Sequence, residues 1–405
     1  MVLFLCYNLS WHLDMNNNDK KMIYLDNSAT TEAYPEVRDI VVQTLSEDFG
    51  NPSSMHVMGV DSEKYIKKAA SDIASSLKVK DKEIYFTSGG TESNNWAIRG
   101  AAYALKRRGN RIITSTMEHP SVSAVFDDLE KEGFEVIRIG LKDDALDMEA
   151  LDAALDENTI LVSIMLVNNE VGIKTDPYEI GKMIKAKSKL AVYHADAVQA
   201  YGKINIEPKA SGIDLLSVSV HKIHGPKGVG FLYKSENVLI KPLILGGGQQ
   251  DALRSGTYNV PGIAGLGEAA SLVSERLDEN ANKMTELRDA LIKGFASLDD
   301  VVIHGDFDRE GLMAPHIVNA SFIGVGSEVL LHSLEDYGIC VSAGSACSTH
   351  KKAKSPTLES LGASDAELNS ALRFSFSEGN TLEEVDITID ALAKLLPMLR
   401  RYRAH

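Results

Sequence analysis

The chain has 405 residues, of which 44% are hydrophobic and 24% are charged, a composition typical of globular proteins. A chain of this length exceeds what one hydrophobic core usually holds, so we expect two domains. The formal net charge of −15 argues against a nucleic-acid-binding surface as the main activity, because contact with phosphate backbones depends on positive charge.

Residues 1–21 are expected to be a disordered extension that precedes the first ordered strand. The segment starts with a few apolar residues, but it has neither the basic start nor the small-residue cleavage site of a secretory signal peptide. No stretch of the chain reaches the roughly 20 apolar residues that a membrane span needs. We therefore expect no membrane association.

The three cysteines, Cys6, Cys340 and Cys347, are too few for a disulfide framework and show no spacing typical of a metal site. This pattern indicates a reducing compartment. We expect a cytoplasmic protein without a bound metal.

Short apolar runs alternate with longer amphipathic stretches between Glu83 and Tyr233, which predicts an α/β domain with a mainly parallel seven-stranded sheet. The expected strands are residues 83–87, 111–116, 134–139, 159–165, 190–196, 215–220 and 229–233. Ligands of such sheets bind beyond the carboxyl ends of the strands. Candidate site residues lie at or just after the ends of five of these strands: Ser88, His119, Asn169, Asp196 and Ser219.

A long helix, from Pro261 to about Leu298, is predicted by its apolar period and leads to a smaller α+β unit. The expected elements of that unit are a strand at 316–322, a helix at 328–338, a strand at 371–377 and a final helix at 382–402. We place the large domain at residues 22–264, with its first residues able to pack on the small domain, and the small domain at residues 265–405.

Lys222 lies between two histidines and a glycine-rich turn, in the segment Ser217–Gly230. A neutral lysine amine attacks carbonyl groups, and pyridoxal phosphate is the cofactor that recruits lysine in this way. Asp196 ends an apolar strand, where it can keep the cofactor's ring nitrogen protonated, and Gln199 follows on the same turn. Alone, such a lysine is usually a solvated loop residue and such an aspartate a helix cap. Together they indicate a pyridoxal phosphate site.

Gly90 and Thr91 stand between the strand at 83–87 and the start of a helix. Helix N-termini bind phosphate through free backbone N–H groups, and glycine lets the ligand approach closely. A plain capping box, with Thr91 or Ser88 as the N-cap, is an equally open interpretation. The chain has neither a GxxxxGK[ST] motif nor a GxGxxG motif that opens a helix after a strand.

His119, Asn169 and Thr257 are weaker candidates. An imidazole at His119 can stack on a flat ring and move protons, although a histidine before proline is more often structural. Asn169 can hydrogen-bond a ring oxygen or a substrate. Thr257 follows the glycine run Gly246–Gly248. Its hydroxyl is a candidate hydrogen-bond donor to a phosphate held by a second subunit.

Cys347 lies in a loop of small residues followed by His350 and Lys351, a setting that favours the thiolate and suits a nucleophile. An incidental surface cysteine is the alternative. Cys340 instead is typical of a strand cysteine that fills core. Arg373 stands within an apolar strand, so it must be paired, either with the carboxylate of an amino acid or in a structural salt bridge.

From Ile23 to the last helix, the chain resembles the cysteine desulfurases of the NifS and IscS type, which are fold-type-I pyridoxal phosphate enzymes of the class V aminotransferases. The motifs that carry the resemblance are YLDNSATT, NPSSMH, TSGGTESNN, EHPSV, NNEVG, DAVQ, SVHKIHGPKG, GGGQQDALRSGT, GSACS and LRFSFS. The resemblance implies this fold, with a large and a small domain, in a homodimer.

The resemblance also implies a role for each candidate residue. The residues implied to hold the cofactor ring and its aldehyde are Lys222, Asp196, Gln199, Asn169 and His119. Those implied at the phosphate are Gly90, Thr91, Ser219, His221 and, from the partner subunit, Thr257. Asn169 and Arg373 would hold the carboxylate of L-cysteine, with Lys222 as the catalytic amine. Cys347 would accept the sulfur as a persulfide and pass it to an acceptor protein, either an iron-sulfur scaffold or a tRNA-thiolating enzyme, without direct contact to nucleic acid.

Two other interpretations stay open. An aminotransferase or a selenocysteine lyase would keep the cofactor, although a transaminase has no need of Cys347. The second alternative is a non-catalytic scaffold for sulfur transfer. Three departures from the family pattern are Gly90, where many relatives have alanine, Ala343, where many have serine, and the basic loop after Cys347. We expect that loop to favour an acidic partner surface.

Overall fold

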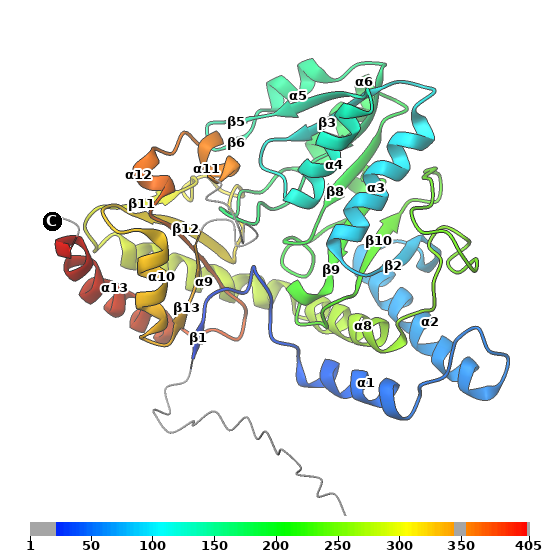
Figure 1. Ribbon diagram of the computed structural model, residues 1–405, viewed down its shortest axis with the longest axis horizontal. Helices are drawn as coiled ribbons and strands as arrows, with labels where there is room; N and C mark the ends of the chain where they lie inside the picture. Colours follow the sequence, from blue (N-terminus) through cyan, green and yellow to red (C-terminus); the bar gives the residue numbers. More distant parts are fainter. Residues whose placement is uncertain (1–21, 344–353, 403–405) are drawn as a thin grey trace, which may run out of the picture.

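The computed structural model describes residues 22–343 and 354–402. The expected extension at residues 1–21 and the predicted nucleophile Cys347 therefore lie outside the described residues. Figure 1 shows two lobes, a larger one built around a twisted sheet and a smaller one that contains the C-terminal helix.

The large lobe contains a seven-stranded sheet in the order β2-β10-β9-β8-β7-β3-β4. All neighbours are parallel except that β10 runs antiparallel to β2 and to β9. The strands are β2 (Ile84–Thr87), β3 (Arg111–Ser115), β4 (Glu135–Ile139), β7 (Thr159–Ser163), β8 (Val192–Asp196), β9 (Leu215–Ser219) and β10 (Gly230–Lys234). Each lies within one residue of an expected strand or inside it, so the predicted mainly parallel sheet is confirmed.

Helices cover both faces of this sheet (Figure 1). They are α1 (Pro35–Ser46), α2 (Val57–Leu77), α3 (Gly90–Leu105), α4 (Pro120–Lys131), α5 (Met148–Ala154), α6 (Pro177–Lys187), α7 (Pro208–Ser211) and α8 (Val260–Glu275). Short 3-10 turns span Asp81–Glu83 and Val220–Lys222, and a small hairpin pairs β5 (Leu141–Lys142) with β6 (Ala145–Leu146).

Most strand positions are apolar because both faces of the sheet are covered, whereas β4 at one edge exposes Glu135 and Arg138. In β2, Ile84 and Phe86 face one hydrophobic core, whereas Tyr85 between them faces the other. Leu161 and Val162 in β7 divide in the same way. Continuous apolar runs, rather than alternating ones, are therefore what this sheet requires.

The small lobe contains a four-stranded sheet in the order β11-β12-β15-β14. Its strands are β11 (Val301–His304), β12 (Ile317–Phe322), β14 (Ser342–Ala343) and β15 (Ala371–Ser375). Its helices are α9 (Leu277–Phe295), α10 (Ser327–Glu335), α11 (Pro356–Ser360), α12 (Asp365–Leu368) and α13 (Leu382–Tyr402). The N-terminal strand β1 (Ile23–Tyr24) pairs with β13 (Ile339–Cys340) at this lobe, so the described chain starts on the small domain (Figure 1).

The single long helix expected from Pro261 to about Leu298 is wrong, because the chain leaves the helix at Arg276, with φ −118° and ψ 20°. The buried face of α8 belongs to the core of the large lobe, whereas that of α9 belongs to the core of the small lobe. The expected boundary after residue 264 therefore falls inside α8, and we place it at Arg276. Among the described residues, no helix has the length and apolar character needed to cross a membrane.

Candidate active site

A cavity of about 330 Å³ lies between the two lobes, within the usual size of small-molecule sites. It is lined by all of the expected site residues except Ser88, Thr257 and Cys347: Gly90, Thr91, His119, Asn169, Asp196, Gln199, Ser219, His221, Lys222 and Arg373. Asp196 ends β8 and Ser219 ends β9, while Arg373 comes from β15 of the small lobe. The parallel sheet thus brings its polar strand ends to one place, as the topology requires.

Lys222 closes the short turn that follows β9. Its Nζ donates hydrogen bonds to the backbone oxygens of Ser28 and Ala29, each at 2.6 Å. These two residues belong to the segment between β1 and α1, which also lines the cavity. The N-terminal segment therefore helps to set the position of the lysine amine.

Asp196 is buried, and both of its carboxylate oxygens are oriented by the protein. Oδ1 accepts the backbone N–H of Val198 at 2.9 Å, and Oδ2 accepts Nδ2 of Asn94 at 2.7 Å. Sequence reasoning did not single out Asn94. Its signal is its spacing, because it stands three residues after Thr91 and so lies on the same face of α3.

His119 is the N-cap of α4, where its ring is held by Ser121. The backbone N–H of Ser121 donates to Nδ1 of His119 at 3.1 Å, so the neutral ring carries its proton on Nε2. Burial lowers the pKa of His119; the Asp196 charge opposes this shift, and the Lys222 charge adds to it. The imidazole is therefore neutral at pH 7, and its Nε2–H is the group that can donate to a ligand.

Glu118, the residue before His119, is a second buried group that sequence reasoning missed. Its Oε1 accepts the hydroxyl of Ser115 at 2.6 Å and the backbone N–H of Met165 at 2.9 Å. Burial raises its pKa to about 8, which those two hydrogen bonds oppose and the Asp196 charge reinforces. The carboxyl group is thus neutral near pH 7, a state that no sequence pattern indicated.

The start of α3 offers a cradle for an anion. The N-cap is Gly89, with φ +147°, and no side chain caps the helix, so neither Thr91 nor Ser88 plays the capping role that was left open. A Cβ on Gly90 would lie 2.8 Å from Cγ2 of Val198. The first N–H groups of the helix are therefore accessible to a ligand, and they favour a negatively charged one.

Ser219 and His221 stand beside this cradle. Burial, followed by the charges of Lys222, Lys227 and Lys203, lowers the pKa of His221 to about 4. A neutral His221 can donate one N–H to an anion without adding charge. Its Nδ1 lies 3.2 Å from the hydroxyl oxygen of Thr30.

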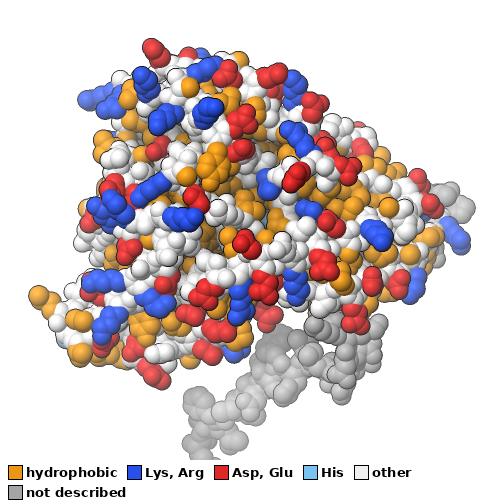
Figure 2. Space-filling model, turned by 180° about the vertical axis from the view of Figure 1, so that it is seen from behind, with side chains coloured by type: hydrophobic (Ala, Val, Ile, Leu, Met, Phe, Trp, Pro, Cys, Tyr) orange, Lys and Arg blue, Asp and Glu red, His pale blue; other side chains and the backbone are white. Residues whose placement is uncertain are grey.

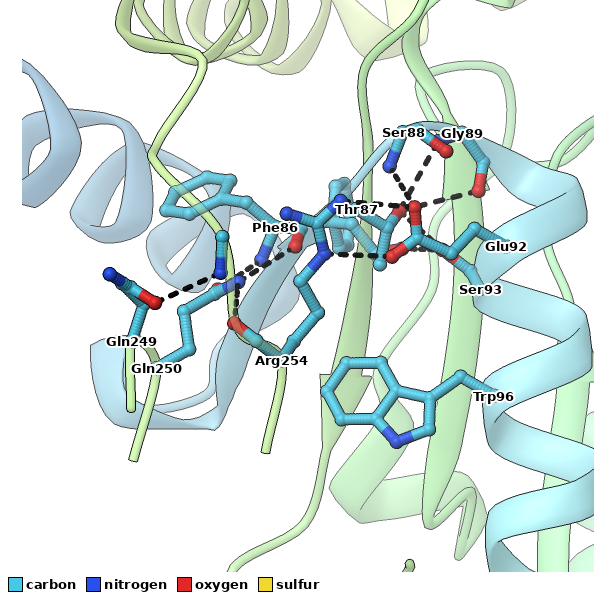
Figure 3. Close-up of polar contacts among 12 residues, drawn as sticks. Phe86, Thr87, Ser88, Gly89, Glu92, Ser93, Trp96, Gln249, Gln250 and Arg254 are labelled. Carbon is cyan, nitrogen blue, oxygen red and sulfur yellow. Dashed lines mark hydrogen bonds and ion pairs between the residues drawn. The ribbon is translucent and has the colours of Figure 1, made fainter. Parts of the chain in front are cut away.

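The loop that carries Thr257 is fastened to the same cradle (Figure 3). Arg254 donates to both carboxylate oxygens of Glu92, at 2.8 and 3.1 Å, and Glu92 in turn accepts the backbone N–H of Ser88 at 2.8 Å. The amide of Gln250 pairs with the backbone N–H and C=O of Phe86 in β2, at 2.6 and 2.9 Å. Thr257 itself is exposed and does not line the cavity of its own chain.

Two buried oxygens in the cavity wall have no hydrogen-bond partner within the described ranges: Oε1 of Gln199 and Oγ of Ser28. The other end of the Gln199 amide donates to the backbone oxygen of Ser28 at 2.9 Å. Buried polar atoms are nearly always satisfied. The unmatched oxygens therefore mark where a polar ligand belongs.

Arg373 is only 3% exposed, and two of its nitrogens are paired. One donates to Oδ1 of Asp26 at 2.8 Å, and the other to the backbone oxygen of Asn169 at 2.8 Å. Its Nε has no partner among the residues that the structure describes. Arg373 thus makes the structural salt bridge and still keeps a donor for a carboxylate.

Cys347 lies outside the described residues, but both flanks of its segment are fixed at the cavity wall. Ser342 in β14 stands opposite Arg373 in β15. On the other side, the hydroxyl of Ser355 donates to Oε2 of Glu170, which lines the cavity, at 2.6 Å.

Comparisons with known proteins identify the family of the chain. The family model "Aminotransferase class-V" matches residues 23–388. Cysteine desulfurase IscS of Clostridium botulinum is 41% identical over 382 residues, which cover 94% of this chain and 96% of that protein. The solved structure of a NifS-like protein superposes with a TM-score of 0.88 at 36% identity and covers 94% of this chain and 100% of that one.

A further solved structure, SspA in complex with cysteine, superposes with a TM-score of 0.77 at 30% identity, over 89% of this chain and 100% of that one. The family match and the curated relatives span nearly the whole described fold. The chain therefore belongs to the aminotransferase class-V family, in its group of NifS- and IscS-type cysteine desulfurases.

Proposed function

We propose that this protein is a pyridoxal phosphate-dependent cysteine desulfurase, which converts L-cysteine to L-alanine and holds the sulfur as a persulfide on Cys347. The observation that carries the proposal is a single cavity that joins an amine, a carboxylate and an arginine, from Lys222, Asp196 and Arg373. The names of the relatives support the same reaction.

The residues of the cavity suit this cofactor. The uncapped start of α3, together with Ser219 and the neutral His221, matches a phosphate group. Asp196 can keep the ring nitrogen protonated, and the unmatched Oε1 of Gln199 can accept a hydrogen bond from a ring hydroxyl. When bound, the cofactor would supply an electron sink for the bonds at the Cα of the amino acid.

Each of the chain's own groups then has a defined task. The Lys222 amine would hold the cofactor aldehyde and, once displaced, carry the proton of the substrate Cα. Asp196 is kept in place for the ring nitrogen by Asn94 and Val198. His119, with its proton on Nε2, would stack on the ring and donate a hydrogen bond.

Sulfur transfer needs a second nucleophile. The Cys347 thiolate would attack the substrate sulfur, so that an S–S bond forms while the bond from sulfur to Cβ breaks. The electron pair of the broken bond stays on carbon, which takes up a proton to give alanine. The proposal for Cys347 is supported by the two flanks of its segment, because Ser342 pairs with Arg373 and Ser355 bonds Glu170.

A homodimer is part of the proposal. Several large apolar side chains are exposed, namely Phe49 at 65%, Met55 at 100%, Leu239 at 72% and Leu245 at 78%. Exposed apolar groups of this size are typical of an interaction surface. In a dimer of this kind the exposed Thr257 would reach the phosphate of the partner subunit.

The persulfide would then pass to an acceptor protein that serves iron-sulfur cluster assembly or tRNA thiolation. Cys347 must stay a free thiol between cycles, so the compartment has to be reducing. We therefore infer that the protein works in the cytoplasm.

The test measures sulfide and alanine formed from L-cysteine with a thiol reductant. We expect equal amounts from the wild type, loss of both products in Cys347→Ala with the cofactor absorbance kept, and loss of that absorbance in Lys222→Ala. Cys340→Ala is the matched control and should behave as the wild type, since Cys340 lies in β13 and not in the cavity wall. Activity indifferent to Cys347 would instead favour an aminotransferase.

A further inference from the structure

Asp26 lies directly behind the arginine that faces the cavity. Its Oδ1 accepts a hydrogen bond from Arg373 at 2.8 Å, and the side chains are 18% and 4% exposed respectively. Asp26 does not line the cavity, so it reaches a ligand only through Arg373.

The backbone around Asp26 is fixed to the strand that carries Arg373. Asp26 forms a parallel bridge with Ser375, two residues beyond Arg373 on β15. The N–H of Asn27 donates to the oxygen of Ser375 at 3.2 Å, and the N–H of Ser375 donates to the oxygen of Leu25 at 2.7 Å. The Asp26 carboxylate and the Arg373 guanidinium thus belong to two segments that backbone hydrogen bonds hold together.

Glu170 is the other carboxyl group near Arg373, and it does not take the same role. Its Oε2 is bonded to the hydroxyl of Ser355, and burial raises its pKa, although that hydrogen bond and the Arg373 charge oppose the shift. Asp26 is therefore the carboxylate that both neutralises and orients the buried guanidinium.

The geometry assigns Asp26 as a positioning residue that holds Arg373 so that Nε and the remaining N–H groups meet the α-carboxylate of the amino-acid substrate. This inference rests on the proposed function and deepens it, because it names what selects an amino acid over a plain amine. A buried arginine without this partner would turn toward other acceptors, such as Glu170, and lose the bidentate geometry that carboxylates require.

Orientation and charge make opposite predictions for this residue. If Asp26 acted by its charge, removing that charge would strengthen the attraction between Arg373 and a carboxylate. If Asp26 acts by orientation, Asp26→Asn should preserve substrate binding, because the amide oxygen still accepts the hydrogen bond. Asp26→Ala should then weaken binding, since it removes the hydrogen-bond acceptor as well as the charge.

The experiment measures equilibrium binding of L-alanine and of ethylamine to the cofactor-loaded protein, followed by the change in visible absorbance. L-alanine carries the carboxylate and has no sulfur to transfer, whereas ethylamine lacks the carboxylate. We expect Asp26→Ala to weaken L-alanine binding about tenfold and leave ethylamine binding unchanged, while Asp26→Asn stays within about threefold of the wild type. Turnover of L-cysteine should show the same loss mainly in KM rather than in kcat.

Asp156→Ala is the matched control, because Asp156 also pairs with an arginine, Arg111, but away from the cavity. Thermal unfolding and cofactor occupancy are recorded for every variant. Wild-type binding of L-alanine by Asp26→Ala would overturn the inference, as would equal weakening of ethylamine binding. A wild type that binds no pyridoxal phosphate would instead overturn the proposed function, so the two failures are distinguishable.

Discussion

Gly90 shows how closely the anion cradle packs against the rest of the site. A Cβ at this position would lie 2.8 Å from Cγ2 of Val198, a residue that also lines the cavity. We expect Gly90→Ala to lower the free energy of unfolding by about 1–3 kcal/mol and to weaken pyridoxal phosphate binding, because the extra methyl group overpacks the turn.

The double variant Gly90→Ala, Val198→Ala removes the atom that the new methyl group would strike. It should regain most of the stability and of the cofactor affinity, as measured by urea unfolding and by titration of the apoprotein. If the double variant binds the cofactor no better than Gly90→Ala, the contact with Val198 is not the cause.

Asp214 gives the protein a pH-dependent weakness outside the site. Burial raises its pKa to about 6, an effect that its hydrogen bond from the N–H of Tyr193 opposes. This bond, of 3.0 Å, links the residue before β9 to β8. Between these two pKa values, the folded protein therefore holds a proton on Asp214 that the unfolded chain, with an aspartate pKa near 3.9, has already lost.

The stability from this proton is present below about pH 4 and is lost as the pH rises to about 6. Asp214→Asn keeps the acceptor oxygen and never ionises. We expect it to be more stable than the wild type by about 1–3 kcal/mol at pH 8 and no more stable at pH 4. Urea unfolding at both pH values checks this, and a pH-independent difference would argue against ionisation of Asp214.

At the scale of elements, the ion pair of Arg254 with Glu92 joins the start of α3 to the loop that carries Thr257 (Figure 3). Burial alone would raise the pKa of Glu92, but the hydrogen bonds from Arg254 and Ser88 lower it overall, so the carboxylate is charged. We expect Arg254→Met to weaken cofactor binding about tenfold, because both the turn and the loop lose their anchor.

Titration of the apoprotein with pyridoxal phosphate, followed by fluorescence, measures this loss. The matched control is Lys142→Met, which removes an exposed ion pair between the hairpin strand β5 and Glu149 of α5 and should leave the affinity unchanged. An unchanged affinity in Arg254→Met would show that the loop holds its position through Gln250 and the backbone alone.

Sequence patterns were sufficient to predict the strands of the large sheet, because short apolar runs between amphipathic stretches are typical of buried strands. They failed at Arg276, since the apolar period continues from α8 into α9 although the two helices pack on different cores. They also missed short strands such as β13 and β14, which exist only through their partners.

The candidate site also contains residues that the sequence could predict and residues that it could not. Residues with their own chemistry, such as Lys222 and Asp196, could be found from type and order along the chain. Residues that act through another group could not, because their importance depends on contacts between distant segments. Asn94 and Asp26 are of this kind, and the second is 347 residues from the arginine it holds.

At the scale of the whole molecule, charge is spread widely. The net charge is −15, and Figure 2 shows acidic and basic side chains interspersed across one face, with hydrophobic side chains between them. A basic cluster therefore stands out against the acidic total. The segment after Cys347 supplies one in sequence, with Lys351, Lys352 and Lys354.

Of these three lysines only Lys354 lies within the described residues, where it pairs with Asp365 at 2.7 Å. Lys351 and Lys352 are thus the ones whose charge we expect to attract an acidic acceptor. Reversing both to glutamate should slow sulfur transfer to such an acceptor about tenfold at low salt, because steering between opposite charges speeds association. Alanine formation with a small thiol reductant should not change, since that reaction needs no docking.

The comparison is made at low and at high salt, with the acceptor in limiting amount. Added salt should slow the wild type toward the rate of the variant, because screening removes the attraction. Lys182 and Lys185, which are exposed on α6, provide a control pair of reversals with the same change in net charge. If the control pair slows transfer equally, the overall charge of the molecule matters and the position beside Cys347 does not.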